Sequence, residues 1–199
     1  VRYKYKQKMT LVNNTWMELK PNEDFDGNQE WFDEYYARIK LKIDYQNIPK
    51  DVFEQWIHPH HKNYETLKNY SWLDFKKMEF IVREWNFDEL SNLYVIENYR
   101  NYFIGRSKLS DFKQFFCKAD DLKYWKEKGT WRIPPIILDV NSLRSNIPID
   151  CELVRPFQLV EGHSRLGYLH SMNRISELNK GKIASKHRIY LMKEKNTPI

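Results

Sequence analysis

The sequence is poor in cysteine and has no long apolar run, and each shortage excludes a class of protein. Its 199 residues include two cysteines, Cys117 and Cys151. They are too few for a disulfide framework and lack the spacing of a zinc site, so we predict that both are packing residues. No apolar run approaches the roughly 18 residues that a membrane-spanning helix needs. We therefore expect no membrane partner.

The first residues of the sequence do not resemble a signal peptide. They read Val1-Arg2-Tyr3-Lys4, without the apolar core of a signal peptide. A first residue other than methionine suggests a longer or processed N-terminus. We expect a cytoplasmic protein.

Aromatic residues are abundant. Seven Trp, thirteen Tyr and eleven Phe make up 16% of the chain, and 41% of it is hydrophobic. Such a composition argues against disorder and provides enough apolar surface for one sizeable packed domain, alone or with an extension.

Positive charge gathers in the last quarter of the sequence. The formal net charge is +6. Residues 151–199 carry nine Lys/Arg against four Asp/Glu, whereas residues 1–150 are nearly balanced. This distribution favours an anionic partner such as a nucleotide, although a solvated basic face would show the same pattern.

Residues 1–128 predict a mixture of helices and strands. Alternation of apolar and charged residues from Ile39 to Tyr45 predicts a half-buried strand, and Pro49 suits the start of a short helix. Residues 58–72 are predicted as an irregular loop, and Met78–Trp85 as a strand. Further helices are predicted over residues 88–102, with Asp88 as the cap, from residue 110 onward, and over residues 120–128 up to Gly129.

Residues 129–199 predict a compact β–β–α–β unit. The run Pro134-Pro135-Ile136-Ile137-Leu138-Asp139 is typical of a proline-led strand that is buried on both faces. A second strand is predicted over residues 157–161, a helix over residues 164–179 that stops at Gly181, and a last strand over residues 187–192. The fold class is therefore α+β, with a soft boundary at residue 128 and a core shared by the two parts.

The turn Glu161-Gly162-His163-Ser164-Arg165 carries the functional prediction. A strand that turns at glycine into a helix exposes the first amides of that helix, which attract phosphate. Arg165 could grip phosphate oxygens, and Ser164 could cap the helix. Glu161 could hold Mg²⁺ or accept a proton, and His163 could act as an acid or base. A plain strand-to-helix corner is the alternative for the same five residues.

The order of a proline-led strand, a second strand and this turn resembles the ParB/sulfiredoxin superfamily. The resemblance covers residues 131–192 and rests on "PPIILD" and "FQLVEGHSRLGYL". In ParB proteins the corresponding Gly-Glu-Arg-Arg turn belongs to a CTP-binding site, and here Gly162 and Arg165 match it. In sulfiredoxin a catalytic cysteine stands where this chain has His163, so sulfiredoxin chemistry is disfavoured.

The most similar motif is the Asp-Gly-His-x-Arg turn of ParB-like small-molecule kinases, including those that phosphorylate free serine. Gly162, His163 and Arg165 match this pattern, and Glu161 replaces the aspartate. The resemblance implies a nucleotide such as ATP, ADP or CTP, a Mg²⁺ ion at Glu161, and catalysis by Glu161 and His163. Gly162, Ser164 and Arg165 would bind the phosphates.

Two other groups of residues invite a functional interpretation. Asp139 ends the buried strand and could face the same cavity as Glu161, as a nucleotide-binding residue, since ligands collect at the carboxyl ends of parallel strands. A turn residue at the end of the strand is the alternative. The stretch His58-Pro59-His60-His61 suggests a metal site, but no cluster of Cys, Asp or Glu adjoins it, although Glu65 is near. A polar loop is therefore favoured, and the rim of a pocket or a partner site is the other alternative.

Three functions compete at this point. The first is a nucleotide-binding or phosphate-binding protein, in its enzymatic form a Mg²⁺-dependent phosphotransferase or nucleotidase. The second is a prokaryotic immunity, antitoxin or defence accessory protein that binds a protein partner without catalysis. Nucleic-acid binding is disfavoured, because the DNA-reading helices of ParB proteins follow the nucleotide domain and this chain ends soon after Met192.

Overall fold

The computed structural model describes residues 12–195 as an α+β protein that divides into two compact units. The N-terminal unit holds described residues 12–78, 144–153 and 195. The sheet unit holds residues 79–143 and 154–194. The pieces predicted within residues 1–11 lie outside the described residues.

The division between these units does not fall at residue 128. Residues 79–128 contribute Leu90, Phe115 and Trp125 to a buried cluster that also contains Leu159 and Leu169. This segment therefore belongs to the same core as residues 154–194. Residues 79–128 share this core with the C-terminal elements, whereas residues 12–78 belong to the other unit.

The N-terminal unit is built from short helical pieces. They are α1 (Asn14–Glu18), α2 (Phe32–Ile39), η1 (Ile43–Tyr45), α3 (Lys50–Val52), η2 (Phe53–Ile57), α4 (His58–His60) and α5 (Tyr64–Tyr70). Pro49 immediately precedes α3, so the predicted helix near Pro49 is confirmed. The loop predicted over residues 58–72 is wrong: the Asn63 side chain accepts hydrogen bonds from the amides of Glu65 and Thr66 and starts α5.

The strand predicted over residues 39–45 is also wrong. Tyr35 and Ile39 are both buried and lie four residues apart on α2, which is helical spacing. Leu41 is 77% exposed and Ile43 is 80% exposed, so the alternating apolar residues do not share a buried face.

Packed rings form the centre of the N-terminal unit. Trp16 stacks on His61 with 4.6 Å between ring centroids, and it meets Phe75 at 5.1 Å and Trp56 at 5.9 Å. All four side chains are buried. The His61 Nε2 atom lies 2.9 Å from the carbonyl oxygen of Trp16, so it acts as the donor.

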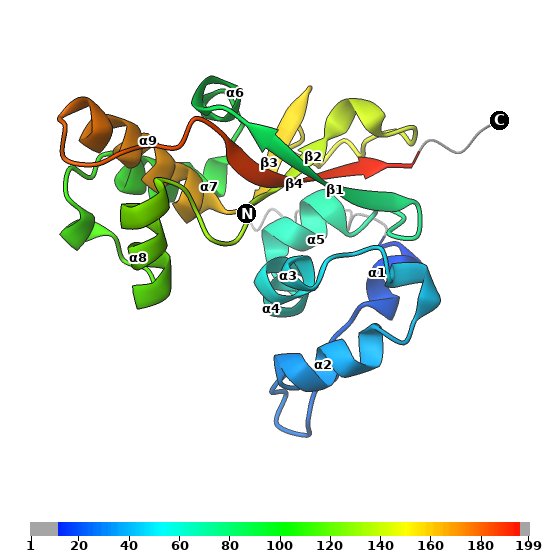
Figure 1. Ribbon diagram of the computed structural model, residues 1–199. Coiled ribbons are helices and arrows are strands. Elements are labelled where there is room, and N and C mark those ends of the chain that lie inside the picture. Colours follow the sequence, from blue (N-terminus) through cyan, green and yellow to red (C-terminus); the bar gives the residue numbers. More distant parts are fainter. Residues whose placement is uncertain (1–11, 196–199) are drawn as a thin grey trace, which may run out of the picture. The chain divides into compact units, whose positions relative to one another are not determined.

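The sheet unit contains a four-stranded mixed sheet in the order β1-β4-β2-β3 (Figure 1). Its strands are β1 (Met78–Trp85), β2 (Ile136–Asp139), β3 (Phe157–Glu161) and β4 (His187–Glu194), and all four predicted strands of this region are confirmed. β2 runs antiparallel to β3 and parallel to β4. The three isoleucine and leucine residues of β2 are fully buried, as its continuous apolar run predicts.

Six helical segments accompany the sheet: α6 (Phe87–Ser91), α7 (Glu97–Ser107), η3 (Phe112–Gln114), α8 (Ala119–Lys128), η4 (Val140–Ser142) and α9 (His163–Glu177). The single helix predicted over residues 88–102 is in fact α6 and α7. Asn86, not Asp88, caps α6, in a capping box with Glu89. Between the two helices Tyr94 forms a bridge to Gln158, where the Leu159 amide donates to the Tyr94 carbonyl.

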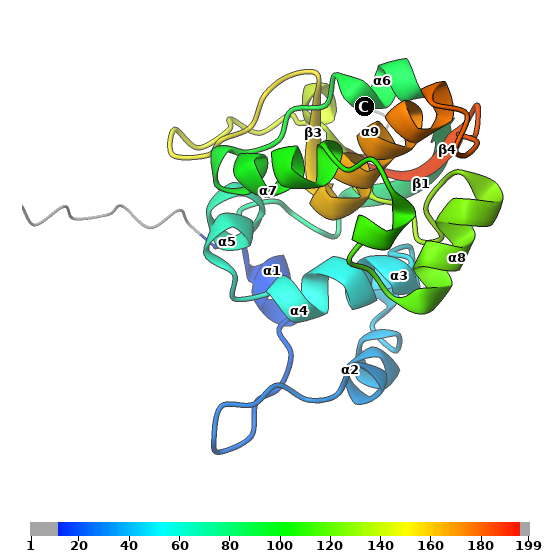
Figure 2. The same ribbon diagram turned by 90° about the vertical axis from the view of Figure 1, so that its left-hand side faces the viewer.

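Helices α7 and α9 pack side by side (Figure 2). Gly167 on α9 allows this approach, because a Cβ atom there would lie 2.5 Å from the Cβ of Arg106 and 2.9 Å from the carbonyl oxygen of Phe103. The predicted stop of α9 at Gly181 is wrong in position. The chain turns at Asn179, which has a φ of 56°.

Candidate functional site

The turn between β3 and α9 requires glycine at its second position. Gly162 immediately precedes α9 with φ 110° and ψ 23°, in the left-handed region. A Cβ atom at Gly162 would lie 2.6 Å from the Cβ of Pro135 and 3.1 Å from Nη2 of Arg165. Any side chain here would meet both backbone strain and a clash. The proline-led strand and the turn are therefore packed directly against each other.

The turn brings Glu161 and Arg165 together. The two side chains form an ion pair with Nη2 3.7 Å from Oε1, and each is partly buried. Ser164 does not cap α9, because the helix begins at His163 and no side-chain cap bond is made at Gly162. Instead the Ser164 hydroxyl lies 3.1 Å from the hydroxyl of Tyr102 on α7.

His163 is buried against α7. Its ring centroid lies 4.4 Å from that of Tyr99, and the side chain is 6% exposed. Its predicted role as an acid or base requires a substrate atom within hydrogen-bond reach. Burial at the helix interface favours a packing role for this ring.

Asp139 lies at the other end of the strand pair from Glu161. Because β2 and β3 are antiparallel, Asp139 is opposite Phe157, and Glu161 is opposite Ile136. Four residues of strand separate the two positions by roughly 13 Å. The Asp139 carboxylate accepts a hydrogen bond from the Asn141 amide at the start of η4. The expectation that Asp139 and Glu161 share a cavity is therefore wrong, because it assumed that β2 and β3 run parallel.

A pocket of about 250 Å³ lies at the first turn of α9. Of the five residues in the predicted turn, Ser164 and Arg165 line it, whereas Glu161, Gly162 and His163 do not. The other lining residues come from residues 116–133 and from α9: Phe116, Cys117, Lys118, Asp121, Trp125, Trp131, Arg132, Ile133 and Tyr168. We refer to this cavity as the α9 pocket.

Cations outnumber carboxylates in the α9 pocket. Arg165, Arg132 and Lys118 line it together with one carboxylate, Asp121, which accepts a 2.8 Å hydrogen bond from Nε of Arg132. The lining side chains therefore carry a net charge of +2, and the Glu161 carboxylate beside Arg165 offsets one of these charges. Burial raises the pKa of the Cys117 thiol, so this pocket residue is not an activated thiolate at neutral pH.

Aromatic rings form the rest of the wall. Trp125 meets Trp131 and Tyr168 edge to face, with centroid distances of 6.1 and 6.3 Å. The Tyr168 hydroxyl donates a 2.9 Å hydrogen bond to the carbonyl oxygen of Phe116. Sequence reasoning missed these residues, and the one available signal was the aromatic and basic pair Trp131-Arg132 just before the proline-led strand.

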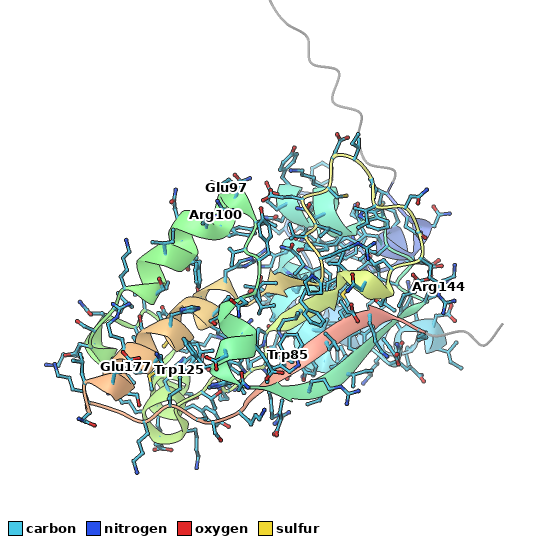
Figure 3. All side chains as sticks on the ribbon, turned by 90° about the horizontal axis from the view of Figure 1, so that it is seen from above. Trp85, Glu97, Arg100, Trp125, Arg144 and Glu177 are labelled. Carbon is cyan, nitrogen blue, oxygen red and sulfur yellow. The ribbon has the colours of Figure 1, made fainter. Side chains whose placement is uncertain are left out.

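A second, larger pocket of about 520 Å³ lies between the α6–α7 segment and the start of β3. Leu93, Phe103 and Phe157 supply apolar wall, and Arg100 and Arg155 supply charge. Arg100 pairs with Glu97 at 2.7 Å, and both residues lie at the start of α7 (Figure 3). Arg155 donates a 2.9 Å hydrogen bond to Asn141. Both cations of this pocket have partners within the protein, as Arg165 and Arg132 do in the α9 pocket.

The histidine-rich stretch does not assemble a metal site. Within residues 12–195 no group of three or more His, Cys, Asp or Glu side chains is arranged to hold a metal ion. His58 and His61 instead contact the backbone carbonyls of Glu30 and Trp16, each at 2.9 Å. His61 is therefore a buried core residue, not part of the predicted polar loop.

Comparisons with known proteins found no relative of this chain. No protein family, curated protein or solved structure matches the chain significantly. Among the described helices, none is long and apolar enough to cross a membrane.

Proposed function

We propose that the sheet unit binds the phosphate of a nucleotide or of another phosphorylated small molecule in the α9 pocket. The main support is that two residues of the predicted turn, Ser164 and Arg165, line this pocket. The side chains that line the pocket carry a net positive charge. Enclosed, partly apolar pockets with a few convergent polar groups are the usual form of a ligand site.

The first turn of α9 supplies further attraction for an anion. α9 has fifteen residues, and its first intrahelical hydrogen bond runs from the Leu166 amide to the Gly162 carbonyl. The amides before Leu166 and the positive end of the helix dipole therefore favour a phosphate group at this end. Arg165 adds a guanidinium group that matches phosphate geometry.

The topology of β2, β3, α9 and β4 supports a relationship to the ParB/sulfiredoxin superfamily. We propose that these four elements are a unit of that kind, with β1, α6, α7 and α8 as additions. Such a relationship implies a phosphate contact at Gly162 and Arg165, and of these two residues Arg165 lines the α9 pocket.

The residues do not form a magnesium site on their own. Glu161 is paired with Arg165, and Asp139 lies at the opposite end of the strand pair. Mg²⁺ usually takes one or two carboxylates together with substrate phosphates. We therefore propose phosphate binding without a metal-dependent step. Phosphotransferase or nucleotidase activity through Glu161 and His163 stays a prediction, to be tested with and without Mg²⁺.

A thermal-shift panel tests the proposal. The full chain is titrated with inorganic phosphate, ribose 5-phosphate, and nucleoside mono-, di- and triphosphates, each with and without Mg²⁺. We expect stabilisation by phosphorylated compounds, since a ligand of the native state raises its stability. Arg165→Ala should abolish the shift. Arg83→Ala, which removes the same charge from an exposed position on β1, should retain it. Absence of any shift in the wild-type protein would disprove the proposal.

Protein binding is the second candidate, and a feature of the N-terminal unit favours it. Four large apolar side chains within residues 25–43 are exposed: Phe25, Trp31, Leu41 and Ile43. Exposed apolar side chains of this size are common at protein interfaces when they form one patch. Co-purification from the native host tests this function. Recovery of the chain alone, or equal recovery of a partner by Trp31→Ser, would argue against it.

A further inference from the structure

The wall of the α9 pocket is mostly aromatic, and one ring in it is exposed. Phe116 lines the pocket and is 86% exposed, whereas Trp125, Trp131 and Tyr168 are buried. A large exposed ring costs free energy in water and becomes favourable when another surface covers it. Phe116 is thus available to a ligand in the pocket.

The position of Phe116 is held by the buried wall. Tyr168 donates its hydroxyl hydrogen to the Phe116 carbonyl, and its own ring stacks on Phe115 with a 4.4 Å centroid distance and a 14° angle between planes. The neighbouring Phe115 is buried. The backbone at Phe116 is therefore held by the hydrogen bond from Tyr168 and by the buried side chain of Phe115, while the Phe116 ring is exposed.

The size and charge of the pocket limit the anion that it can match. A volume of about 250 Å³ is below the roughly 300–1,000 Å³ typical of sites for drug-sized ligands. The lining cations exceed the lining carboxylate by two, and Glu161 beside Arg165 reduces this excess to one positive charge, which favours a single phosphomonoester of charge about −1.5 to −2 over a triphosphate. A triphosphate would place two further phosphates beyond this set of lining cations.

We propose that the α9 pocket selects a monophosphate that carries a planar ring, of the nucleoside monophosphate class. The phosphate would meet Arg165 and Ser164, and the ring would stack on Phe116. This inference rests on the proposed phosphate-binding function and adds two claims to it: the ring contributes affinity through Phe116, and one phosphate suffices.

A cysteine in the pocket wall allows a direct test. Cys117 lines the pocket, and Cys151 lies in the N-terminal unit, where its thiol donates to the Lys68 carbonyl. Alkylation of the two thiols in the same full-length molecule, followed by peptide mass spectrometry, distinguishes pocket occupancy from general stabilisation. The competitors are four nucleoside 5′-monophosphates, ribose 5-phosphate, inorganic phosphate and the matching triphosphates.

We expect a nucleoside monophosphate to slow alkylation of Cys117, but not of Cys151, at concentrations at least about tenfold below those of ribose 5-phosphate. Phe116→Ala should weaken protection by the monophosphate by roughly 5- to 150-fold, the range for loss of one base–aromatic stack, and leave ribose 5-phosphate unchanged. Phe25→Ala, at a fully exposed position of the N-terminal unit, is the matched control and should change neither.

The outcomes separate this inference from the function on which it rests. Equal protection by ribose 5-phosphate and nucleoside monophosphates, or tighter protection by triphosphates, would overturn the inference and keep the phosphate-binding function. Failure of every phosphorylated compound to protect Cys117 would overturn both. Because Phe116 is exposed, its truncation is not expected to affect folding, and an unchanged circular dichroism spectrum would verify this.

Discussion

Both units gather aromatic rings, but they use them differently. In the N-terminal unit Trp16, Trp56 and Phe75 are enclosed with a histidine in a closed cluster. In the sheet unit Trp125 and Trp131 pack edge to face and also border a pocket. The same residue types thus make a closed core in one unit and part of a pocket wall in the other. The two aromatic clusters differ because cations and one exposed ring adjoin the cluster of the sheet unit, and not because of their aromatic content.

Truncation of the buried tryptophans should give the largest effects and test this contrast. Trp16→Ala is expected to lower the free energy of unfolding by about 3–5 kcal/mol, because a closed cluster leaves a cavity. Trp125→Ala should cost less, since the space left by its ring opens into the α9 pocket. Trp31→Ala, at an exposed position, should change stability by about 0.5 kcal/mol or less. Denaturant unfolding monitored by circular dichroism measures all three, and an equal loss for Trp16 and Trp125 would remove the contrast.

Acid should destabilise the sheet unit through His187. Burial lowers the pKa of this side chain to about 4, whereas an unfolded histidine titrates near 6.5. Between these values the unfolded state binds more protons than the folded state, so stability is retained above about pH 6.5 and is lost as the pH falls toward 4. The slope should approach about 1.4 kcal/mol per pH unit.

Unfolding free energies of the wild-type protein and of His187→Gln, measured from pH 4 to 7, check this prediction. The variant removes the titrating group and should show a shallower dependence on pH. An identical slope in the two proteins would assign the acid sensitivity to other groups.

The two glycines of the α7–α9 pair offer a sharper comparison within one unit. Gly167→Ala should destabilise the protein by about 1–2 kcal/mol, because the new Cβ would meet backbone of α7 and outweigh the gain in helix propensity. Gly105→Ala, on α7 where an added Cβ would have no neighbouring atom within 4 Å, should stabilise by about 0.5–1 kcal/mol. Thermal unfolding of both variants gives the signs, and the same sign for both would contradict the packing described for Gly167.

The smallest effect concerns thiol reactivity without ligand. Burial raises the pKa of Cys151 to about 11, so its alkylation rate should rise roughly tenfold per pH unit from pH 7 to 10, in step with the thiolate fraction. Stopped-time alkylation with mass spectrometry follows this rate. A rate that levels off near pH 8 would show that the thiol of the N-terminal unit is more accessible than its burial indicates.

The strands of the sheet unit could be predicted from local sequence because proline, glycine or charged residues mark their ends. β3 ends at Glu161 where the apolar run meets Gly162, and β2 follows two prolines. The strand predicted over Ile39–Tyr45 was wrong because apolar and charged residues can alternate by chance after the end of a helix. Only the burial of each side chain shows which face of the segment is covered.

Candidate site residues could be predicted only where they are adjacent in sequence. Ser164 and Arg165 were found because the turn places them together. Lys118, Arg132 and Phe116 were missed because they join the pocket through packing of α8 and the proline-led strand, which no local pattern encodes. Asp139 was misplaced for the same reason, since strand direction depends on the partner and not on the strand itself.

The bridge between Tyr94 and Gln158 also has a consequence for the protein at high concentration. β3 lies at one edge of the sheet, and an uncovered strand edge is a template for pairing between molecules. The segment between α6 and α7 occupies part of that edge through the bond from Leu159 to Tyr94. At the opposite edge, β1 presents the exposed charges of Arg83 and Glu84. One edge is thus partly covered by backbone, and the other carries exposed charged side chains, so crowding should promote aggregation through β1 first.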